Sequence, residues 1–438
     1  MPIDLGLSRV YSLLKQLNNP HINAYKTIHV AGTNGKGSTV AYLSSILTKS
    51  KVRNGRFTSP HMLYYNDCIC INDEVYPLSK FQKVSNLVQE QNQLHKLGCT
   101  EFELLTVTAF KIFELENVEI AVVEVGLGGR LDATNALEPY NKTTKGGVIA
   151  TAITKIGIDH ENLLGNTLAA ISGEKAGIIK RMIPCVLDRT NVKVVVETVQ
   201  NRANELDVPL TLVDGIEEAE PAPAQIISQE VQDLLTLSPL KGDYQLQNLS
   251  VSLKVVELVS PYFLDDAGNC RITNETIRSG IGATRWPGRL QSVQIPNFDF
   301  SVLLDGAHNE SAAIELGKHL RKQRNGQGII FVIGMTKGKS LASLLSHIAE
   351  KTKDTVIGTS FTPPENMPWI SSFPIHQLQQ EASQYVEDVD KFVGEDISKV
   401  FAHVKKYRDQ GDERQVVVCG SLYLCGDVLR LVESGESN

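Results

Sequence analysis

Short apolar runs rich in β-branched residues alternate with longer segments of helical period along most of the chain. Such runs predict strands, and their regular alternation with helices predicts mostly parallel sheets with helices packed against them. The predicted strands span residues 27–31, 119–125, 147–153, 184–187, 208–213, 301–304, 329–333, 355–358 and 416–419. The fold class is therefore α/β.

Chain length and one interruption of this pattern predict two domains. The 438 residues exceed the ~250–300 at which single hydrophobic cores stop growing. Two prolines and a glycine break both periodicities within residues 285–300. We expect a large N-terminal domain of the P-loop ATPase type over 1–290, a hinge linker over 291–298 and a smaller Rossmann-like domain over 299–438. The acidic, proline- and alanine-rich segment 214–225 predicts a surface loop.

Charge and cysteine content indicate which partners and which cellular compartment to expect. The net charge of −7 argues against a nucleic-acid or membrane-surface partner, which would favour a basic face. The seven cysteines form no CxxC pair, which suits free thiols in a reducing compartment. The first residues have the period of an amphipathic helix, and no apolar run reaches the ~18 residues of a membrane span. We expect a cytoplasmic protein.

The stretch "HVAGTNGKGST", His29–Thr39, joins a predicted strand to a helix predicted over 38–49. Its glycines permit a tight turn, and the helix start presents backbone N–H groups to an anion. Lys36 would then reach the phosphates of a nucleotide. The strict pattern GxxxxGK[ST] does not fit, because Gly37 follows the lysine and the hydroxyls arrive one residue later. We expect a phosphate-binding loop; the alternative is a tight turn with a surface lysine.

Two other glycine-containing stretches resemble nucleotide loops less closely. "GMTKGKS", Gly334–Ser340, has one fewer turn-forming glycine before its lysine, so we expect an ordinary β–α loop. "EVGLGGR", Glu124–Arg130, is a partial dinucleotide fingerprint without a clear helix directly after it.

Polar residues follow several predicted strands, where α/β sheets keep their ligands. Ser59 lies in "FTSPHM", Glu124 lies inside an apolar strand, His160 follows another strand, and Lys175 lies in "SGEKAGIIK". Hydroxyl and carboxylate oxygens suit a Mg²⁺ ion that also holds phosphates. Each residue has a structural alternative, since a buried glutamate can pair with a lysine and a histidine can cap a helix. Spacing alone does not show that these residues meet.

Eight motifs occur in the order found in one family: "HVAGTNGKGST", "FTSPHM", "TEFELLTVTAF", "VVEVGLGGRLDATN", "IGIDHENLLGNT", "GEKAGIIK", "WPGRLQ" and "DGAHN". Over almost its whole length the chain resembles the folylpolyglutamate synthase/dihydrofolate synthase family, which belongs to the Mur-ligase-like ATP-dependent amide ligases. The resemblance implies a short "GTNGKGS" phosphate loop. It also implies ATP as co-substrate, two Mg²⁺ ions and activation of a carboxylate as an acyl phosphate.

The resemblance assigns roles to residues of this chain. Those implied to contact ATP are Asn34, Gly35, Lys36, Gly37, Ser38, Asn248, Arg289, Asp305 and His308. Those implied to bind metal are Ser59, Glu124, His160 and Lys175, the last as a carbamate. Those implied to line the pterin side of the substrate pocket are Thr100, Phe102, Glu103, Leu131, Asp132 and Ala133. Lys36, Lys175 and His160 are the expected catalytic residues.

Two activities share this scaffold: adding the first glutamate to dihydropteroate, and extending the glutamate tail of reduced folates. The spellings "GTNGKGS" and "TSPH" make the chain most similar to fungal-type monofunctional dihydrofolate synthases, although bifunctional bacterial enzymes share them. We expect a monomer that uses dihydropteroate, L-glutamate and ATP. The alternatives are a folylpolyglutamate synthase or bifunctional enzyme and, in a different class, a non-ligase P-loop nucleotidase or kinase.

Overall fold

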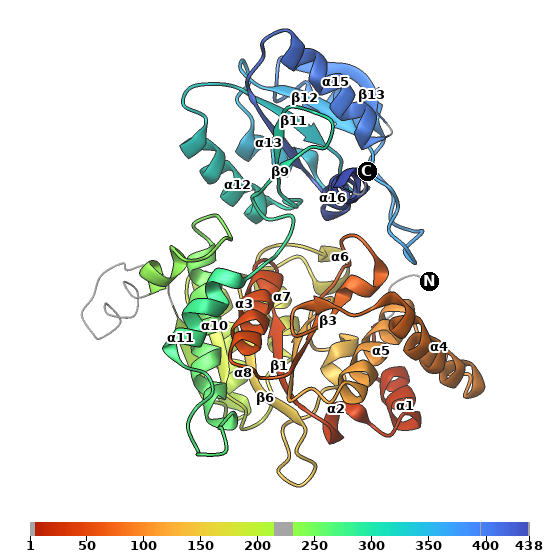
Figure 1. Cartoon of the computed structure of the whole chain (residues 1–438), viewed down its shortest axis with the longest axis vertical. Coiled ribbons are helices and arrows are strands. Elements are labelled where there is room, and N and C mark those ends of the chain that lie inside the picture. The colour runs from red at the N-terminus through yellow and green to blue at the C-terminus, as the bar shows by residue number, and fades with distance from the viewer. Residues whose placement is uncertain (1–4, 214–230, 395, 437–438) are drawn as a thin grey trace. The chain divides into compact units, whose positions relative to one another are not determined.

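The computed structural model describes residues 5–213, 231–394 and 396–436, in two compact units (Figure 1). The first unit comprises Met1–Pro60, Asn66–Pro239 and Tyr244–Arg285. The second comprises His61–Tyr65, Leu240–Asp243 and Trp286–Asn438. The predicted surface loop at 214–225 lies outside the described residues.

An eight-stranded sheet forms the centre of the first unit, in the order β4-β3-β2-β5-β1-β6-β7-β8. Its strands are β1 (Lys26–Ala31), β2 (Asn54–Phe57), β3 (Ile69–Ile71), β4 (Glu74–Val75), β5 (Ile120–Glu124), β6 (Gly147–Ile153), β7 (Cys185–Asp188) and β8 (Leu210–Val213). The strands from β2 to β8 in this order are parallel, while β3 and β4 add an antiparallel edge. The sequence did not reveal β2, β3 and β4, because they are short and β2 (NGRF) has no apolar run.

Helices cover both faces of this sheet (Figure 1). They are α1 (Ser8–Gln16), α2 (Pro20–Asn23), α3 (Lys36–Lys49), α4 (Leu78–Leu94), α5 (Glu101–Leu115), α6 (Glu161–Leu164), α7 (Leu168–Ala176), α8 (Lys193–Glu205), α10 (Gln245–Val259) and α11 (Asn274–Ala283). The helices α3, α10 and α11 pack together, and α10 also contacts β6 and β7. Apolar residues of α7 and α8 pack with residues of β1, β6 and β7 in a separate cluster. The helix α3, which follows the glycine-rich loop, is almost completely buried after its first turn.

The second unit contains a six-stranded sheet in the order β13-β12-β11-β14-β10-β9. Its strands are β9 (Gln291–Gln294), β10 (Ser301–Leu304), β11 (Ile329–Ile333), β12 (Thr355–Thr359), β13 (Asp388–Gly394) and β14 (Gln415–Cys419). All pair in parallel except β9, which runs antiparallel to β10. Residues 291–298, where we expected a linker, therefore begin with a strand of this sheet, held by the buried side chains of Val293 and Ile295.

Five helices accompany the second sheet: α12 (Glu310–Gln323), α13 (Leu341–Ile348), α14 (Ile375–Ala382), α15 (Ile397–Asp409) and α16 (Leu422–Glu436). The edge strand β13 was not predicted, because its sequence DVDKFVG carries three charges. Two mostly parallel sheets with flanking helices confirm the α/β fold class. All seven cysteines are free thiols, and among the described residues no helix has the length and apolarity needed to cross a membrane.

Candidate active site

Four neighbouring strands of the first unit deliver predicted site residues to one edge of the sheet. In the order β2-β5-β1-β6, Ser59 follows β2, Glu124 ends β5, the glycine-rich loop follows β1 and His160 follows β6. All four strands are parallel, so their carboxyl ends lie at the same edge. This sheet order, which the spacing along the chain does not reveal, brings the separate motifs together.

The glycine-rich loop is shaped for close approach to a ligand. The helix α3 begins at Lys36, and no side chain caps its first turn, which leaves backbone N–H groups directed out of the helix start. Gly35 has φ of 91°, and a Cβ atom there would overlap Oδ1 of Asn248. Asn248 in turn donates to Oε1 of Gln245 at 3.0 Å, and Gln245 donates to the hydroxyl of Ser38 at 3.4 Å. The structure thus places Asn248 of α10 directly against the loop.

Lys36 links the loop to β5. Its Nζ donates to the carbonyl oxygen of Thr33 at 3.2 Å and lies 3.6 Å from Oε1 of Glu124. Glu124 is only 4% exposed, and a carboxylate so deeply buried needs a cation beside it. Lys36 supplies that charge here. Glu124 therefore does pair with a lysine, as its structural alternative stated. That lysine is Lys36, the residue that we expect to contact the phosphates.

Lys175 is buried behind the same loop. It lies on α7, is 5% exposed, and donates from Nζ to the carbonyl oxygen of Gly32 at 2.8 Å. Burial, reinforced by the positive charge of Lys36, lowers the pKa of Lys175 to about 7, although Asp159 and Asp132 oppose the shift. A large fraction of this amine is therefore neutral at physiological pH. A neutral amine is nucleophilic, whereas an ammonium group is not.

The loop after β6 holds Asp159 and His160. His160 has φ of 53° and stands at the start of α6, but its side chain forms no helix cap. Its ring is about half exposed, with Nε2 4.0 Å from Oδ1 of Asp159. Asp159 acts electrostatically on Lys175, which places this loop near the glycine-rich loop.

The donor set at this edge suits a hard cation. Ser59 and Glu124, on adjacent strands, offer a hydroxyl and a carboxylate oxygen, which are ligands that Mg²⁺ accepts beside phosphate oxygens and water. Among the described residues, no group of three or more His, Cys, Asp or Glu side chains is arranged to enclose a metal. A cation here would therefore depend on oxygens from the nucleotide and from water.

Asp132 is the centre of a buried hydrogen-bond network. Its carboxylate accepts from the backbone N–H groups of Leu127 at 2.8 Å and Thr134 at 3.0 Å, and from the hydroxyl of Thr134. The pKa of Asp132 is raised above its usual value. Burial is the main cause, and the hydrogen bonds oppose the shift without reversing it. Direct recognition of a substrate by this carboxylate would compete with these donors. The structure gives Asp132 the additional role of holding the loop that follows Glu124.

His29 extends the same network, and sequence reasoning assigned it no role. Its Nε2 lies 2.8 Å from Oγ1 of Thr134. Since the Thr134 hydroxyl donates to Asp132, Nε2 of His29 must carry the proton and donate. Burial lowers the pKa of His29 well below its usual value, so the ring is neutral. In the sequence, His29 could have been noticed as a histidine placed between apolar residues of a predicted strand.

The remaining predicted pocket residues divide into two groups. The ring of Phe102 stacks on Phe57 with 6.1 Å between centroids, and it packs so closely on Gly126 that a Cβ atom there would overlap it. Phe102 is half-buried and lies just beyond the end of β5. Leu131 is also half-buried, and Ala133 is buried.

Thr100 and Glu103 instead stabilise the start of α5. The backbone N–H of Thr100 donates to Glu103 at 2.6 Å, and the N–H of Glu103 donates to the Thr100 hydroxyl at 3.3 Å. This reciprocal pair is a capping box. Arg9 also donates to both carboxylate oxygens of Glu103 at 3.0–3.1 Å. These contacts give the two residues a clear structural function.

The second unit brings together Arg289, Asp305 and His308. Asp305 follows β10, is buried, and accepts from the N–H groups of Leu290 at 3.0 Å and Ala307 at 2.9 Å. Burial raises the pKa of Asp305, opposed by the positive charge of Arg289 and by the hydrogen bonds from the N–H groups of Leu290 and Ala307. His308 donates from Nδ1 to the carbonyl oxygen of Gly306 at 2.8 Å.

The loop at Gly334–Ser340 differs from the glycine-rich loop of the first unit. The hydroxyl of Ser340 accepts from the N–H of Ser343 at 3.1 Å and so caps α13. A side-chain oxygen thus occupies the position that an anion would need at the helix start. This agrees with its prediction as an ordinary β–α loop.

Comparison with known proteins identifies the family. The profile described as "Dihydrofolate synthetase, C-terminal domain" matches residues 289–431. The chain is 40% identical to the dihydrofolate synthetase of Saccharomyces cerevisiae, with 100% of both chains covered. It is 37% identical to a probable dihydrofolate synthetase of Schizosaccharomyces pombe, with 99% of both covered. The chain belongs to the dihydrofolate synthase/folylpolyglutamate synthase family.

A solved structure agrees with this membership. The bifunctional folylpolyglutamate synthase/dihydrofolate synthase of Yersinia pestis, complexed with AMPPNP and a Mn ion, superimposes with a TM-score of 0.75 at 25% identity. The match covers 99% of this chain and 95% of that one. Family membership makes the chain an enzyme of the ligase class and removes the alternative of a non-ligase nucleotidase or kinase. Nucleotide and divalent metal binding are properties of this relative.

The crowding at Gly35 generates a testable prediction. Gly35→Ala adds a methyl group that overlaps Asn248, so we expect ATP affinity to fall by at least about tenfold, or ~1.4 kcal/mol. Gly338→Ala is a matched control, because Gly338 has φ of 90° but open space around its Cβ position. The control should cost only ~1 kcal/mol of stability from the backbone conformation and leave ATP affinity unchanged. Calorimetric titration with ATP measures both; equal effects would disprove the role of the Asn248 contact.

Proposed function

We propose that this enzyme joins L-glutamate to 7,8-dihydropteroate, giving dihydrofolate, ADP and phosphate. The observation that carries the proposal is the sheet edge at which Lys36, Glu124 and Lys175 converge around the glycine-rich loop. The full-length similarity to two fungal dihydrofolate synthetases supports the choice of acceptor.

The loop performs the first half of the reaction. A carboxylate is a poor acyl donor, so it attacks the γ-phosphorus of ATP, ADP leaves, and an acyl phosphate forms. The N–H groups at the start of α3 and the ammonium group of Lys36 stabilise charge on the transferring phosphoryl group. Ser59, Glu124 and His160 would hold Mg²⁺, which would further neutralise that charge. Asn34, Gly37 and Ser38 belong to the same phosphate loop.

The second half of the reaction is attack by an amine. The amino group of glutamate adds to the acyl carbon, and the tetrahedral intermediate collapses to the amide and inorganic phosphate. Water would hydrolyse the acyl phosphate, so the site must exclude it. In this proposal Arg289, Asp305 and His308 also contact the nucleotide.

The aromatic and apolar residues beyond β5 bind the pterin. The half-buried ring of Phe102 offers a flat face for stacking, and Leu131 and Ala133 line the same pocket. Asp132 fixes the loop that carries them. Thr100 and Glu103 act through the capped start of α5, which holds Phe102 in place.

Lys175 enters the reaction as a carbamate in this proposal. Its neutral amine adds to CO₂ and releases a proton, which converts a cation next to Lys36 into an anionic oxygen ligand for a second Mg²⁺. We further propose that the enzyme acts as a monomer in the cytoplasm.

The second candidate function is tail extension, alone or in a bifunctional enzyme. It is favoured by the structural similarity to the bifunctional Yersinia pestis enzyme. The two functions differ in where the reacting carboxylate lies. The benzoate of dihydropteroate must reach the γ-phosphate itself, whereas a folate reaches it through its glutamate.

Glu124→Gln tests the metal role of the buried carboxylate. An amide oxygen is a weaker ligand for a hard cation, so we expect the Mg²⁺ concentration for half-maximal rate to rise by about tenfold or more. Asp188→Asn is a control, since Asp188 ends the more distant strand β7 of the same sheet. Steady-state rates against Mg²⁺ concentration give the result. An unchanged Mg²⁺ dependence would remove Glu124 from the metal site.

The lowered pKa of Lys175 predicts reaction with CO₂. Incubation with ¹³C-bicarbonate should produce a carbamate signal in the ¹³C NMR spectrum that grows as pH rises through about 7, because deprotonation creates the nucleophile. Lys175→Ala should remove the signal. Lys180→Ala should retain it, although burial also lowers the pKa of Lys180, to about 8. A signal that survives Lys175→Ala would contradict the assignment.

The acceptor is tested by product mass. With ATP and L-glutamate, dihydropteroate should yield dihydrofolate, while monoglutamyl tetrahydrofolate should be extended little. Lys36→Ala should abolish both product formation and ATP consumption, whereas Lys339→Ala, in the capped loop of the second unit, should retain them. Efficient extension of tetrahydrofolate without use of dihydropteroate would replace this proposal with the second candidate function.

A further inference from the structure

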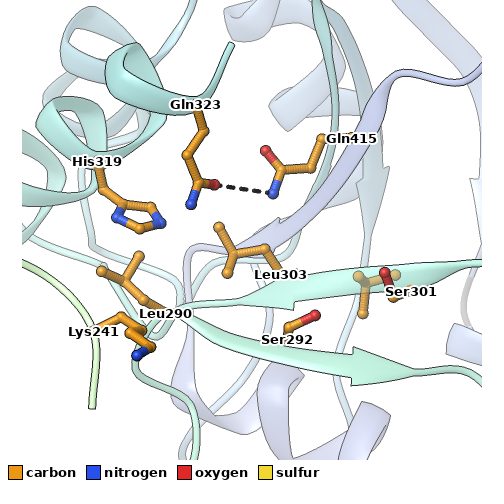
Figure 2. A pocket seen from close by; sticks show the side chains of 9 residues that line it. Lys241, Leu290, Ser292, Ser301, Leu303, His319, Gln323 and Gln415 are labelled. Carbon is orange, nitrogen blue, oxygen red and sulfur yellow. Dashed lines mark hydrogen bonds between the residues drawn. The ribbon is translucent and has the colours of Figure 1, made fainter. Parts of the chain in front are cut away.

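The second unit has a cavity of about 330 Å³ between α12 and the strands β9 and β10 (Figure 2). This volume lies at the lower end of the range for small-molecule sites, ~300–1,000 Å³. Arg289, Asp305 and His308 are not among the residues that line it. The cavity adjoins the cluster already described at Leu290, whose N–H donates to Asp305, but none of the three cluster residues lines it.

Strand alternation explains why this face of the sheet is open. Val302 and Leu304 of β10 face the core that also contains residues of α15 and α16. Ser301 and Leu303 point to the opposite face, and Ser292 of β9 is paired with Leu303. Figure 2 shows His319 and Gln323 reaching from α12 toward Leu303, with the edge of the sheet below them.

The lining is apolar in the middle and polar at both ends. Figure 2 shows Lys241 beside Leu290 at one end and Ser301 at the other, with Leu303 between them and Gln415 opposite Gln323. Gln415 donates to Gln323 at 3.4 Å. In the described part of the chain, the side chains of Lys241, Ser292 and Ser301 form no hydrogen bond or ion pair with the protein.

The charges around the cavity favour an anion. No aspartate or glutamate lines it, and Lys241 contributes an amine. The nearby Asp243 is paired with Lys322 at 2.5 Å, which neutralises its charge. Burial lowers the pKa of His319, with a smaller opposing effect of Asp243, so its neutral ring both donates and accepts hydrogen bonds.

We propose that this cavity binds a small organic anion. Its carboxylate or phosphate group pairs with Lys241 near His319, its apolar part lies on Leu290 and Leu303, and an uncharged polar end meets the amides of Gln323 and Gln415. The combination of an apolar floor with a few convergent polar groups is typical of small-molecule sites.

Titration of the full chain with simple probes tests the proposal. With ¹³C-labelled histidine, and the His319 signal assigned through His319→Gln, benzoate or phenyl phosphate should shift that signal saturably in the ~1 mM range. Benzamide, which is uncharged and has the shape of benzoate, should bind at least about tenfold more weakly. The tighter of the two anions distinguishes a carboxylate from a phosphate ligand.

Three variants complete the test. Lys241→Met should weaken binding of the anion by about tenfold, whereas Lys406→Met, at an exposed position of α15, should not. Ser292→Phe, on the exposed edge strand, should fill the cavity and abolish the shift. The proposal is overturned if His319 shows no saturable shift, if benzamide binds as well as benzoate, or if Lys241→Met changes nothing.

Discussion

Burial of Lys175, next to the positive charge of Lys36, is the constraint on which the site of the first unit depends. Lys36 and Lys175 both approach the glycine-rich loop, one at Thr33 and the other at Gly32. Glu124 lies 3.6 Å from Lys36, whereas among the described residues no carboxylate forms an ion pair with Lys175. Burial and the charge of Lys36 therefore drive Lys175 toward its neutral form. A pKa of about 7 in place of 10.5 corresponds to about 5 kcal/mol against protonation.

The same constraint explains why the surrounding loops are held so firmly. A buried amine and a buried carboxylate keep their charge states only if neighbouring groups do not move. The network from His29 through Thr134 to Asp132 fixes the turn after Glu124, and the contact between Gly35 and Asn248 fixes the glycine-rich loop. These contacts thus maintain the electrostatics of Lys36, Glu124 and Lys175.

Much of the fold was predictable because its central strands are long and apolar. Strands such as β1, β5 and β6 are buried along nearly their whole length, so most of their residues are apolar. The strands that were missed are short, as in β2, or charged, as in β13. Their positions depend on pairing with neighbours, which hydrophobic periodicity does not report.

The individual motifs of the site could be predicted from the sequence, but the contacts between residues of different motifs could not. The glycine-rich loop could be interpreted locally, because strand, turn and helix are consecutive in the sequence. That Lys36 meets Glu124, and that Lys175 lies behind Gly32, follows from the order of β2, β5, β1 and β6 in the sheet. Thr100 and Glu103 are the opposite case. The family resemblance assigned both residues to the substrate pocket, whereas in the structure they form a capping box at the start of α5.

The central claim is that this sheet edge activates a carboxylate by phosphorylation before the amine attacks. The most direct measurement uses dihydropteroate labelled with ¹⁸O in both carboxylate oxygens, with unlabelled ATP and glutamate, and ³¹P NMR of the released phosphate. Our account predicts one ¹⁸O atom in each phosphate, because the carboxylate oxygen that attacks phosphorus leaves with it when the amide forms. Release of phosphate without ¹⁸O during amide formation would contradict it.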